Sequence, residues 1–225
     1  MNRPLLAGLL SLAFAVPASA ARIAPTSYDI PNGSGTASGG SYNYWDAGYG
    51  GSGNKTTDGA PLTGGLGDLT DGVVTTQNWN AVENVTGTGP YVGWNANVTP
   101  DLTLTFNFGA AVDIDTVRVH VDESQVGGVN LPTTLALSWE SGGTQTLNFN
   151  IEDDTADVAP SWLEIGGLGI TGVNSLKISL GYGDLWVFAD EVEFYDAAPI
   201  PEPGSVALML AGLGLVGAAA RKMRL

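Results

Sequence analysis

Acidic side chains gather in three short runs of this sequence, and clustered carboxylates are the groups that bind hard cations. The runs are Asp122-Glu123, Glu152-Asp153-Asp154 with Asp157, and Asp190-Glu191 with Glu193. Because Ca²⁺ takes roughly six to eight oxygen ligands from carboxylates, carbonyls and water, each run is a candidate metal site. The simpler interpretation is a solvated acidic surface. The sequence contains no EF-hand loop, and both interpretations stay open.

Side chains that could perform catalysis are few. His120 is the only histidine, so a Ser-His-Asp triad would have to use it. It lies between Arg118 and Asp122 on the polar face of an expected strand, where we expect a solvated side chain. The sequence has neither G-x-S-x-G nor H-E-x-x-H. We therefore expect that the protein is not an enzyme. The remaining alternative is a hydrolase or lyase with paired carboxylates, because 22 acidic residues offer many possible pairs, although no single pair stands out.

Aromatic side chains on glycine-rich segments form a second candidate site. Tyr182 lies in a Gly-Tyr-Gly turn, and Trp45 and Tyr49 lie in residues 32–67, which hold twelve glycines in 36 positions. Trp and Tyr rings combine an apolar face with a polar edge, the two features that a sugar ring contacts. We predict these three residues as ligand-binding. The alternative is that the rings cover an open sheet edge or anchor the loops.

Charge and composition exclude several classes of function. The chain has 225 residues, no cysteine and a formal net charge of −15. Residues 22–200 hold four basic side chains against 22 acidic ones, a net charge of −18. This charge excludes binding to the phosphate backbone of nucleic acid. The lack of cysteine excludes disulfides, thiol catalysis and cysteine–zinc sites. The fold must be held by its core, and a metal ion is a candidate additional support.

Apolar and polar residues alternate in a series of short segments after Pro100. The alternating segments are 102–108, 117–121, 135–139, 147–151, 176–180, 186–188 and 192–194. A period of two is typical of half-buried strands, and Gly-rich turns separate these segments. We predict an all-β fold, an antiparallel β-sandwich or jelly roll. Its core is expected in residues 68–198, with further strands and loops in residues 21–67.

The first twenty residues predict a secretory signal peptide. Met1-Asn2-Arg3 supplies a positive charge, and residues 5–16 are apolar apart from Gly8 and Ser11. Pro17-Ala18-Ser19-Ala20 then provides a small-residue cleavage site after Ala20. The apolar run is too short to be a stable membrane anchor. We expect the exported domain to begin at Ala21.

The last residues, 199–225, contain three parts in a defined order. Pro201-Glu202-Pro203 comes first, followed by seventeen uncharged residues, 204–220, and by Arg221-Lys222-Met223-Arg224-Leu225. Seventeen helical residues span about 26 Å, close to the hydrocarbon thickness of a bilayer. We predict a single C-terminal transmembrane helix with its basic end on the cytoplasmic side.

This order of parts resembles the PEP-CTERM sorting signal of Gram-negative bacteria, which is paired with a signal peptide as it is here. The resemblance implies that an exosortase, a membrane transpeptidase-like protease, processes the chain near Pro201-Glu202-Pro203. It also implies export across the inner membrane and transient anchoring by the C-terminal helix. The final location would be the cell surface or the extracellular matrix, typically in bacteria that make exopolysaccharide.

The middle region carries a second resemblance. Leu69-Thr70-Asp71-Gly72-Val73 with Thr75-Thr76 and Trp79 looks like the opening loop of galactose-binding-like (discoidin or F5/8-type) sandwiches, and residues 186–194 look like their closing strand. In carbohydrate-binding members, the Asp of that loop and a Glu of the last strand often share a structural Ca²⁺. The resemblance implies Asp71, Thr76 and Glu191 as metal ligands here. The usual Asn after Asp-Gly is missing in this chain.

These observations together predict an exported bacterial cell-surface or biofilm-matrix protein. We expect its β-sandwich to bind envelope polysaccharide or exopolysaccharide, with Ca²⁺ as a structural ion that ties the first strand to the last. The alternative is a structural matrix protein or adhesin without a defined small ligand. Glycan binding separates these two hypotheses.

Overall fold

The alternating segments form the strands of two antiparallel sheets in the computed structural model, which describes residues 20–35, 42–153 and 157–197. Residues 21–197 make up one compact unit, with a hydrophobic core of its own. The predicted all-β sandwich is confirmed. The predicted signal peptide up to residue 19 and the predicted C-terminal helix lie outside the described residues. In the part of the chain that is described, no helix is long and apolar enough to cross a membrane.

The first sheet, sheet A, is built around the last strand of the domain. Its strand order is β1-β12-β7-β10, and β5 also pairs with β12. The bounds are β1 Arg22–Ile23, β5 Val92–Asn95, β7 Thr116–Val121, β10 Ser161–Ile165 and β12 Trp186–Tyr195. A bulge interrupts the β12–β7 register between Ala189 and Glu191. Strand β12, the last of the domain, therefore pairs with segments from the beginning and the middle of the chain.

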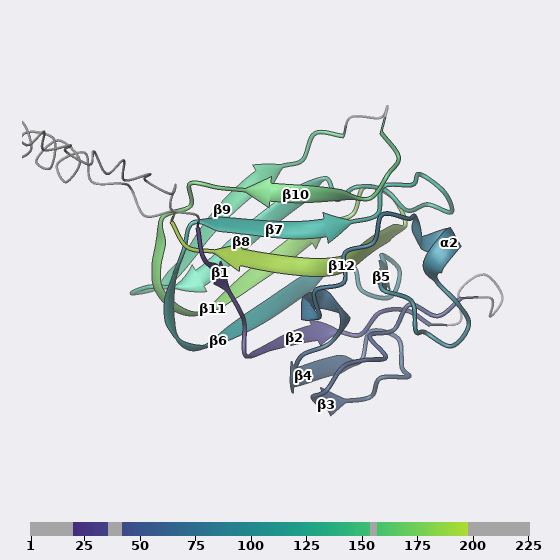
Figure 1. The fold of residues 1–225 in the computed structure, drawn as a ribbon, viewed down its shortest axis with the longest axis horizontal. Coiled ribbons are helices and arrows are strands. Elements are labelled where there is room, and N and C mark those ends of the chain that lie inside the picture. Colours follow the sequence, from purple (N-terminus) through teal and green to yellow (C-terminus); the bar gives the residue numbers. More distant parts are fainter. Residues whose placement is uncertain (1–19, 36–41, 154–156, 198–225) are drawn as a thin grey trace, which may run out of the picture. The chain divides into compact units, whose positions relative to one another are not determined.

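The second sheet, sheet B, has the strand order β3-β4-β2-β6-β11-β8-β9. The bounds are β2 Ser27–Pro31, β3 Ser52–Gly53, β4 Pro61–Gly65, β6 Thr103–Ile114, β8 Thr134–Glu140, β9 Thr144–Asn150 and β11 Ile170–Gly181. Figure 1 shows sheet A in front of sheet B, with β3 and β4 at the lower edge. The long central pair β6–β11 positions the remaining strands of this sheet.

The core lies between the sheets and follows the period-two pattern. Apolar residues of β6, β7, β11 and β12 point inward, among them Leu104, Phe106, Val117, Val119, Leu176, Ile178, Val192 and Phe194. The rings of Phe106 and Phe194 join the two sheets, with centroids 5.0 Å apart. Each such side chain contributes about 1.5–3 kcal/mol through burial, which is how a domain without cysteine holds together.

The glycine-rich segment after β2 is anchored to the sheet by the ring of Tyr49, in line with the alternative interpretation of these rings. Tyr49 packs on Tyr28 with ring centroids 5.1 Å apart, and its hydroxyl accepts a 2.8 Å hydrogen bond from Gly65 N. Two short helices follow, a 3₁₀ helix η1 at Asp68–Thr70 and α2 at Trp79–Val82. Figure 1 places α2 at the right-hand end of the sandwich, close to β5.

Candidate ligand-binding site

A groove of about 770 Å³ opens between the two loops that flank α2. The first loop, residues 71–78, leads from η1 to α2, and the second, residues 83–91, leads from α2 to β5. The groove is lined by Ala47, Gly48, Asp68, Asp71, Val73, Val74, Thr75, Thr76, Gln77, Val82, Gly87, Thr88, Gly89 and Pro90. This lining combines hydroxyl, amide and carboxyl groups with three valines and a proline.

Two carboxylates of β12 hold the first loop against sheet A. Gly72 N donates to Glu191 Oε2 over 2.9 Å, and Thr75 N donates to Asp190 Oδ2 over 2.8 Å. Both carboxylates are buried. Asp71 Oδ1 accepts from Val73 N within the loop itself, at 2.8 Å. The last strand of the domain therefore fixes one wall of the groove.

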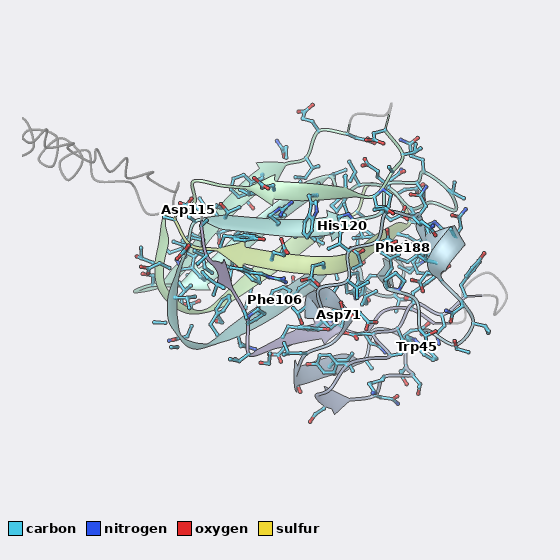
Figure 2. All side chains as sticks on the ribbon, viewed as in Figure 1. Trp45, Asp71, Phe106, Asp115, His120 and Phe188 are labelled. Atoms are coloured by element: carbon cyan, nitrogen blue, oxygen red, sulfur yellow. The ribbon has the colours of Figure 1, made fainter. Side chains whose placement is uncertain are left out.

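His120 lies beneath this loop, so the expectation of a solvated side chain is wrong. Its side chain is buried, its Nδ1 lies 2.5 Å from Asp190 Oδ1, and its ring centroid is 4.9 Å from that of Trp162. Figure 2 shows His120 on β7. The alternation of β7 places His120 opposite the core, as expected, but Asp190 and the loop that it anchors cover that face. The His120–Asp190 pair connects β7 to the groove wall.

Asp122 positions the helix between the two loops. Its Oδ2 accepts from Trp79 N over 2.6 Å, and its Oδ1 accepts from Ser124 N over 2.7 Å. The ring of Trp79 then packs edge-on against Tyr44, with centroids 5.8 Å apart, in a second hydrophobic cluster. A buried carboxylate at the start of a helix satisfies a backbone N–H that has no partner inside the helix. The contact between Asp122 and Trp79 N therefore fixes α2, whose last residue, Val82, lines the groove.

Glu83 lies behind the second loop with its side chain almost fully buried, at 7% exposure. Its Oε1 accepts from Tyr91 N over 2.9 Å, whereas Oε2 has no hydrogen-bond partner among the described residues. A Cβ at Gly89 would overlap this carboxyl group, because the carboxyl group packs directly against the Gly89 backbone. Burial, together with the charges of Asp122 and Asp190, raises the pKa of Glu83 to about 8. The group is therefore mostly protonated at neutral pH.

Asp68, which lines the groove, is a second carboxyl group with a raised pKa. Burial is the main cause that raises its pKa to about 8, and the charges of Asp46, Asp71 and Glu83 add to the effect. A protonated carboxyl group donates one hydrogen bond and still accepts others. The groove therefore offers both donors and acceptors, and its valines offer apolar contact. Such a lining suits a neutral, hydroxyl-rich ligand.

The three predicted calcium ligands do not form a set of oxygen atoms around one point. Glu191 accepts hydrogen bonds from the Arg22 guanidinium group and from Gly72 N, and burial raises its pKa to about 7. Asp71 is engaged with Val73 N, and the Thr76 side chain is exposed. Among the described residues, no group of three or more His, Cys, Asp or Glu side chains is arranged to hold a metal ion.

A Ca²⁺ site needs converging oxygen atoms, whereas N–H donors face the Glu191 carboxylate. In this arrangement the residues do not fit the ion. The calcium prediction made from the sequence is tested below by the addition of CaCl2 or EDTA.

The three predicted sugar-binding rings lie outside the groove lining. Tyr49, predicted as ligand-binding, is not accessible at the surface, because its ring is buried in the main core beside Tyr28. Trp45 is half-buried, donates from Nε1 to Asp58 Oδ1 over 2.7 Å, and lies apart from Asp71 in Figure 2. Tyr182 is also half-buried, packs against the core, and donates to Thr99 O over 2.6 Å. Their roles in binding stay predictions.

Several groups that shape the groove had no motif in the sequence. Asp190 belongs to one of the acidic runs, but Asp68 and Glu83 stand alone between uncharged neighbours. Only the folding of loops over sheet A brings these carboxyl groups together. Of the predicted processing residues, Ala20 is the first described residue, and Pro201-Glu202-Pro203 lie outside the described ranges.

Comparisons with known proteins identify two regions of the sequence. Residues 25–196 match the family described as the DS-like domain of discoidin domain-containing receptor 1/2. Residues 199–224 match the PEP-CTERM protein-sorting motif. Both resemblances drawn from the sequence, to the sorting signal and to discoidin-like domains, are confirmed. No curated protein sequence matches the chain.

Solved structures with detectable similarity are distant. The F5/8 type C domain of a Bacteroides fragilis protein is 15% identical with a TM-score of 0.39, over 57% of this chain and 78% of that one. The family 32 carbohydrate-binding module of Clostridium perfringens NanJ, solved with galactose, is 12% identical with a TM-score of 0.37, over 47% and 76%. A second Clostridium perfringens module of family 32 is 15% identical with a TM-score of 0.33, over 58% and 83%.

Proposed function

The chain belongs to the family of DS-like domains of discoidin domain-containing receptors 1 and 2, and on this premise we propose that it binds polysaccharide at a bacterial cell surface. Its PEP-CTERM sorting motif implies a secreted, cell-surface protein. The proposed ligand is envelope polysaccharide or the exopolysaccharide of a biofilm matrix, and the proposed host is a Gram-negative bacterium.

Sorting in this proposal follows the two ends of the chain. A signal peptide directs export, the C-terminal helix anchors the protein in the inner membrane for a time, and an exosortase cuts near Pro201-Glu202-Pro203. The domain between the two ends carries a net charge of −18, which argues against nucleic acid as a partner.

The groove beside α2 is the observation that carries the binding proposal. Thr76, Thr88 and Gln77 supply hydroxyl and amide groups, and Asp68 supplies a carboxyl group that is mostly protonated at neutral pH. The valines of the lining suit the apolar C–H face of a sugar ring. Sites for small molecules combine such apolar walls with a few polar groups that set orientation.

Two other functions remain as alternatives to the proposal. A structural matrix protein or adhesin would use the rigid sandwich without a defined ligand. A secreted hydrolase or lyase would turn over the polysaccharide, which would contradict our expectation that the protein is not an enzyme. Incubation of purified domain with polysaccharide, followed by analysis of reducing ends, separates binding from turnover.

Removing polar side chains from the groove tests the proposed site. We expect the double substitution Thr76→Ala, Gln77→Ala to lower the affinity for a bound glycan about tenfold, because two hydrogen bonds to the ligand are lost. Both side chains are exposed, so the fold of residues 21–197 is expected to stay intact. Binding of a glycan array, followed by calorimetry on the best ligand, measures the change.

Matched controls separate the groove from the aromatic rings. Thr146→Ala, on the exposed strand β9, is expected to leave the affinity unchanged. Trp45→Ala and Tyr182→Ala test the rings predicted from the sequence. If these two abolish binding while the groove variant binds normally, the groove is not the site. Binding to no glycan favours the structural alternative.

A further inference from the structure

The first and last strands of sheet A meet at the two ends of the folded domain. Arg22 pairs with Tyr195 and Ile23 with Phe194 in antiparallel register. Beyond this pair, Ala21 N donates to Asp196 Oδ1 over 2.5 Å, and Asp196 N donates to Ala21 O over 3.1 Å. The residue expected to become the N-terminus thus contacts the last residues before the sorting motif.

Carboxylates dominate the strand that receives these contacts. Arg22 bonds to Glu191 and lies 3.4 Å from Glu193, and Arg118 reaches Glu193 at 3.1 Å. Asp196 and Asp113 line the same cavity, which adds a further carboxylate to this side of the domain. Arg22, Lys55, Arg118 and Lys177 are the four basic side chains of residues 22–200, and two of them bind β12. A positive charge at Ala21 would add a third cation to this acidic region.

Cleavage after Ala20 would create that charge. The amide nitrogen of Ala21 would become an α-ammonium group, which keeps its hydrogen-bonding capacity and gains a full positive charge. A charged donor to a carboxylate makes a stronger hydrogen bond than a neutral amide does. The Ala21–Asp196 contact would then change from a neutral-donor hydrogen bond into an ion pair, with no rearrangement of the strands.

We infer that the mature N-terminus forms an ionic clasp, in which the Ala21 α-ammonium group binds Asp196 and the Arg22 guanidinium group binds Glu191 and Glu193. The clasp is completed by signal-peptide removal and joins β1 to β12 at the place where a calcium ion was expected to join the first and last strands. This inference uses the predicted cleavage site and is independent of polysaccharide binding.

Two forms of the domain that differ only at the N-terminus test the clasp. One form spans residues 21–197 with a free Ala21 amine, released from a fusion partner by a protease that leaves no extra residue. The other form keeps Pro17-Ala18-Ser19-Ala20, which moves the amine by up to about 14 Å, beyond the screening length of about 8 Å at physiological salt. Each form is also made with Asp196→Asn, which keeps the size of the side chain and removes its charge.

The free-amine form is expected to melt about 1–4 °C higher than the extended form, and this difference is expected to vanish in the Asp196→Asn pair. Arg22→Gln is expected to lower the melting temperature, whereas Lys177→Gln is the matched control without an ion pair among the described residues. Addition of CaCl2 or EDTA is expected to leave the melting temperature of the free-amine form unchanged.

Three results would overturn the inference. Equal melting temperatures of the free-amine and extended forms would remove the role of the amine. A difference that persists in the Asp196→Asn pair would assign the effect to something other than this ion pair. A fall in melting temperature with EDTA, restored by Ca²⁺, would show that a metal ion joins these strands and that Arg22 does not replace it.

Discussion

Three carboxyl groups around the groove and the last strand have pKa values far above those of exposed Asp and Glu. Burial raises the pKa of Asp68 and Glu83 to about 8 and that of Glu191 to about 7. Only Glu191 belongs to an acidic run in the sequence; Asp68 and Glu83 have no local signal. Their environment is created by residues distant in the chain, such as Asp122 and Asp190 for Glu83 or Asp46 for Asp68. Sequence reasoning therefore finds the acidity of the domain but not the buried groups.

These pKa shifts predict that the domain loses stability as the pH rises. Between about pH 4 and 8 the folded state keeps protons on these groups that the unfolded state releases, so the free energy of unfolding falls. We expect a melting temperature at least about 3 °C higher at pH 5 than at pH 8. Scanning calorimetry across this range measures it. Glu83→Gln is expected to flatten the curve, and a melting temperature that rises toward pH 8 would contradict the assignment.

At the scale of the elements, alternation in the sequence predicts the strands and leaves the loops undetermined. The segments 117–121 and 176–180 lie in β7 and β11, and residues 103–108 lie in β6, a strand that continues to Ile114. The expected exposure of polar faces fails at His120, because the loop at 71–78 covers the outer face of sheet A there. A period-two pattern predicts which residues share a face of the sheet. It does not predict whether a loop from elsewhere in the chain covers that face.

The pairing of β5 with β12 depends on the absence of a side chain at Gly93. A Cβ at Gly93 would overlap the ring of Phe188, which belongs to the aromatic cluster next to α2. We expect Gly93→Ala to destabilise the domain by about 1–3 kcal/mol. Gly50→Ala is the matched control, because its Cβ would meet only an ordinary contact with Leu66 O, and its effect is expected within about 0.5 kcal/mol. Urea unfolding measures both, and equal stability of the two variants would contradict the packing described.

At the scale of the whole molecule, the sequence separates the two ends, which direct export and sorting, from the folded domain between them. The order Pro201-Glu202-Pro203, apolar stretch and basic end identifies the sorting motif, which the comparison with known families confirms. Between the two ends, residues 21–197 form the folded unit, with 22 acidic side chains and no cysteine. The groove was not predictable at this level, because it depends on how two loops close around α2.

Processing at the sorting motif predicts the mass of the mature protein. Protein recovered from the surface of its native host is expected to begin at Ala21 and to end near Pro201, since an exosortase would remove the apolar tail. Intact-mass spectrometry of the surface fraction measures both ends in one experiment. Recovery of chains that still end at Leu225 would contradict exosortase processing. Host cells without the exosortase serve as the control, and there the tail is expected to remain.

Binding of polysaccharide by the folded domain is the central claim, and a direct titration tests it. Purified residues 21–197 are titrated calorimetrically with exopolysaccharide isolated from the native host, beside the Thr76→Ala, Gln77→Ala variant. We predict saturable binding by the unmodified domain and an affinity about tenfold lower for the variant. The absence of any saturable heat with the unmodified domain, under conditions where it is folded, would contradict the account.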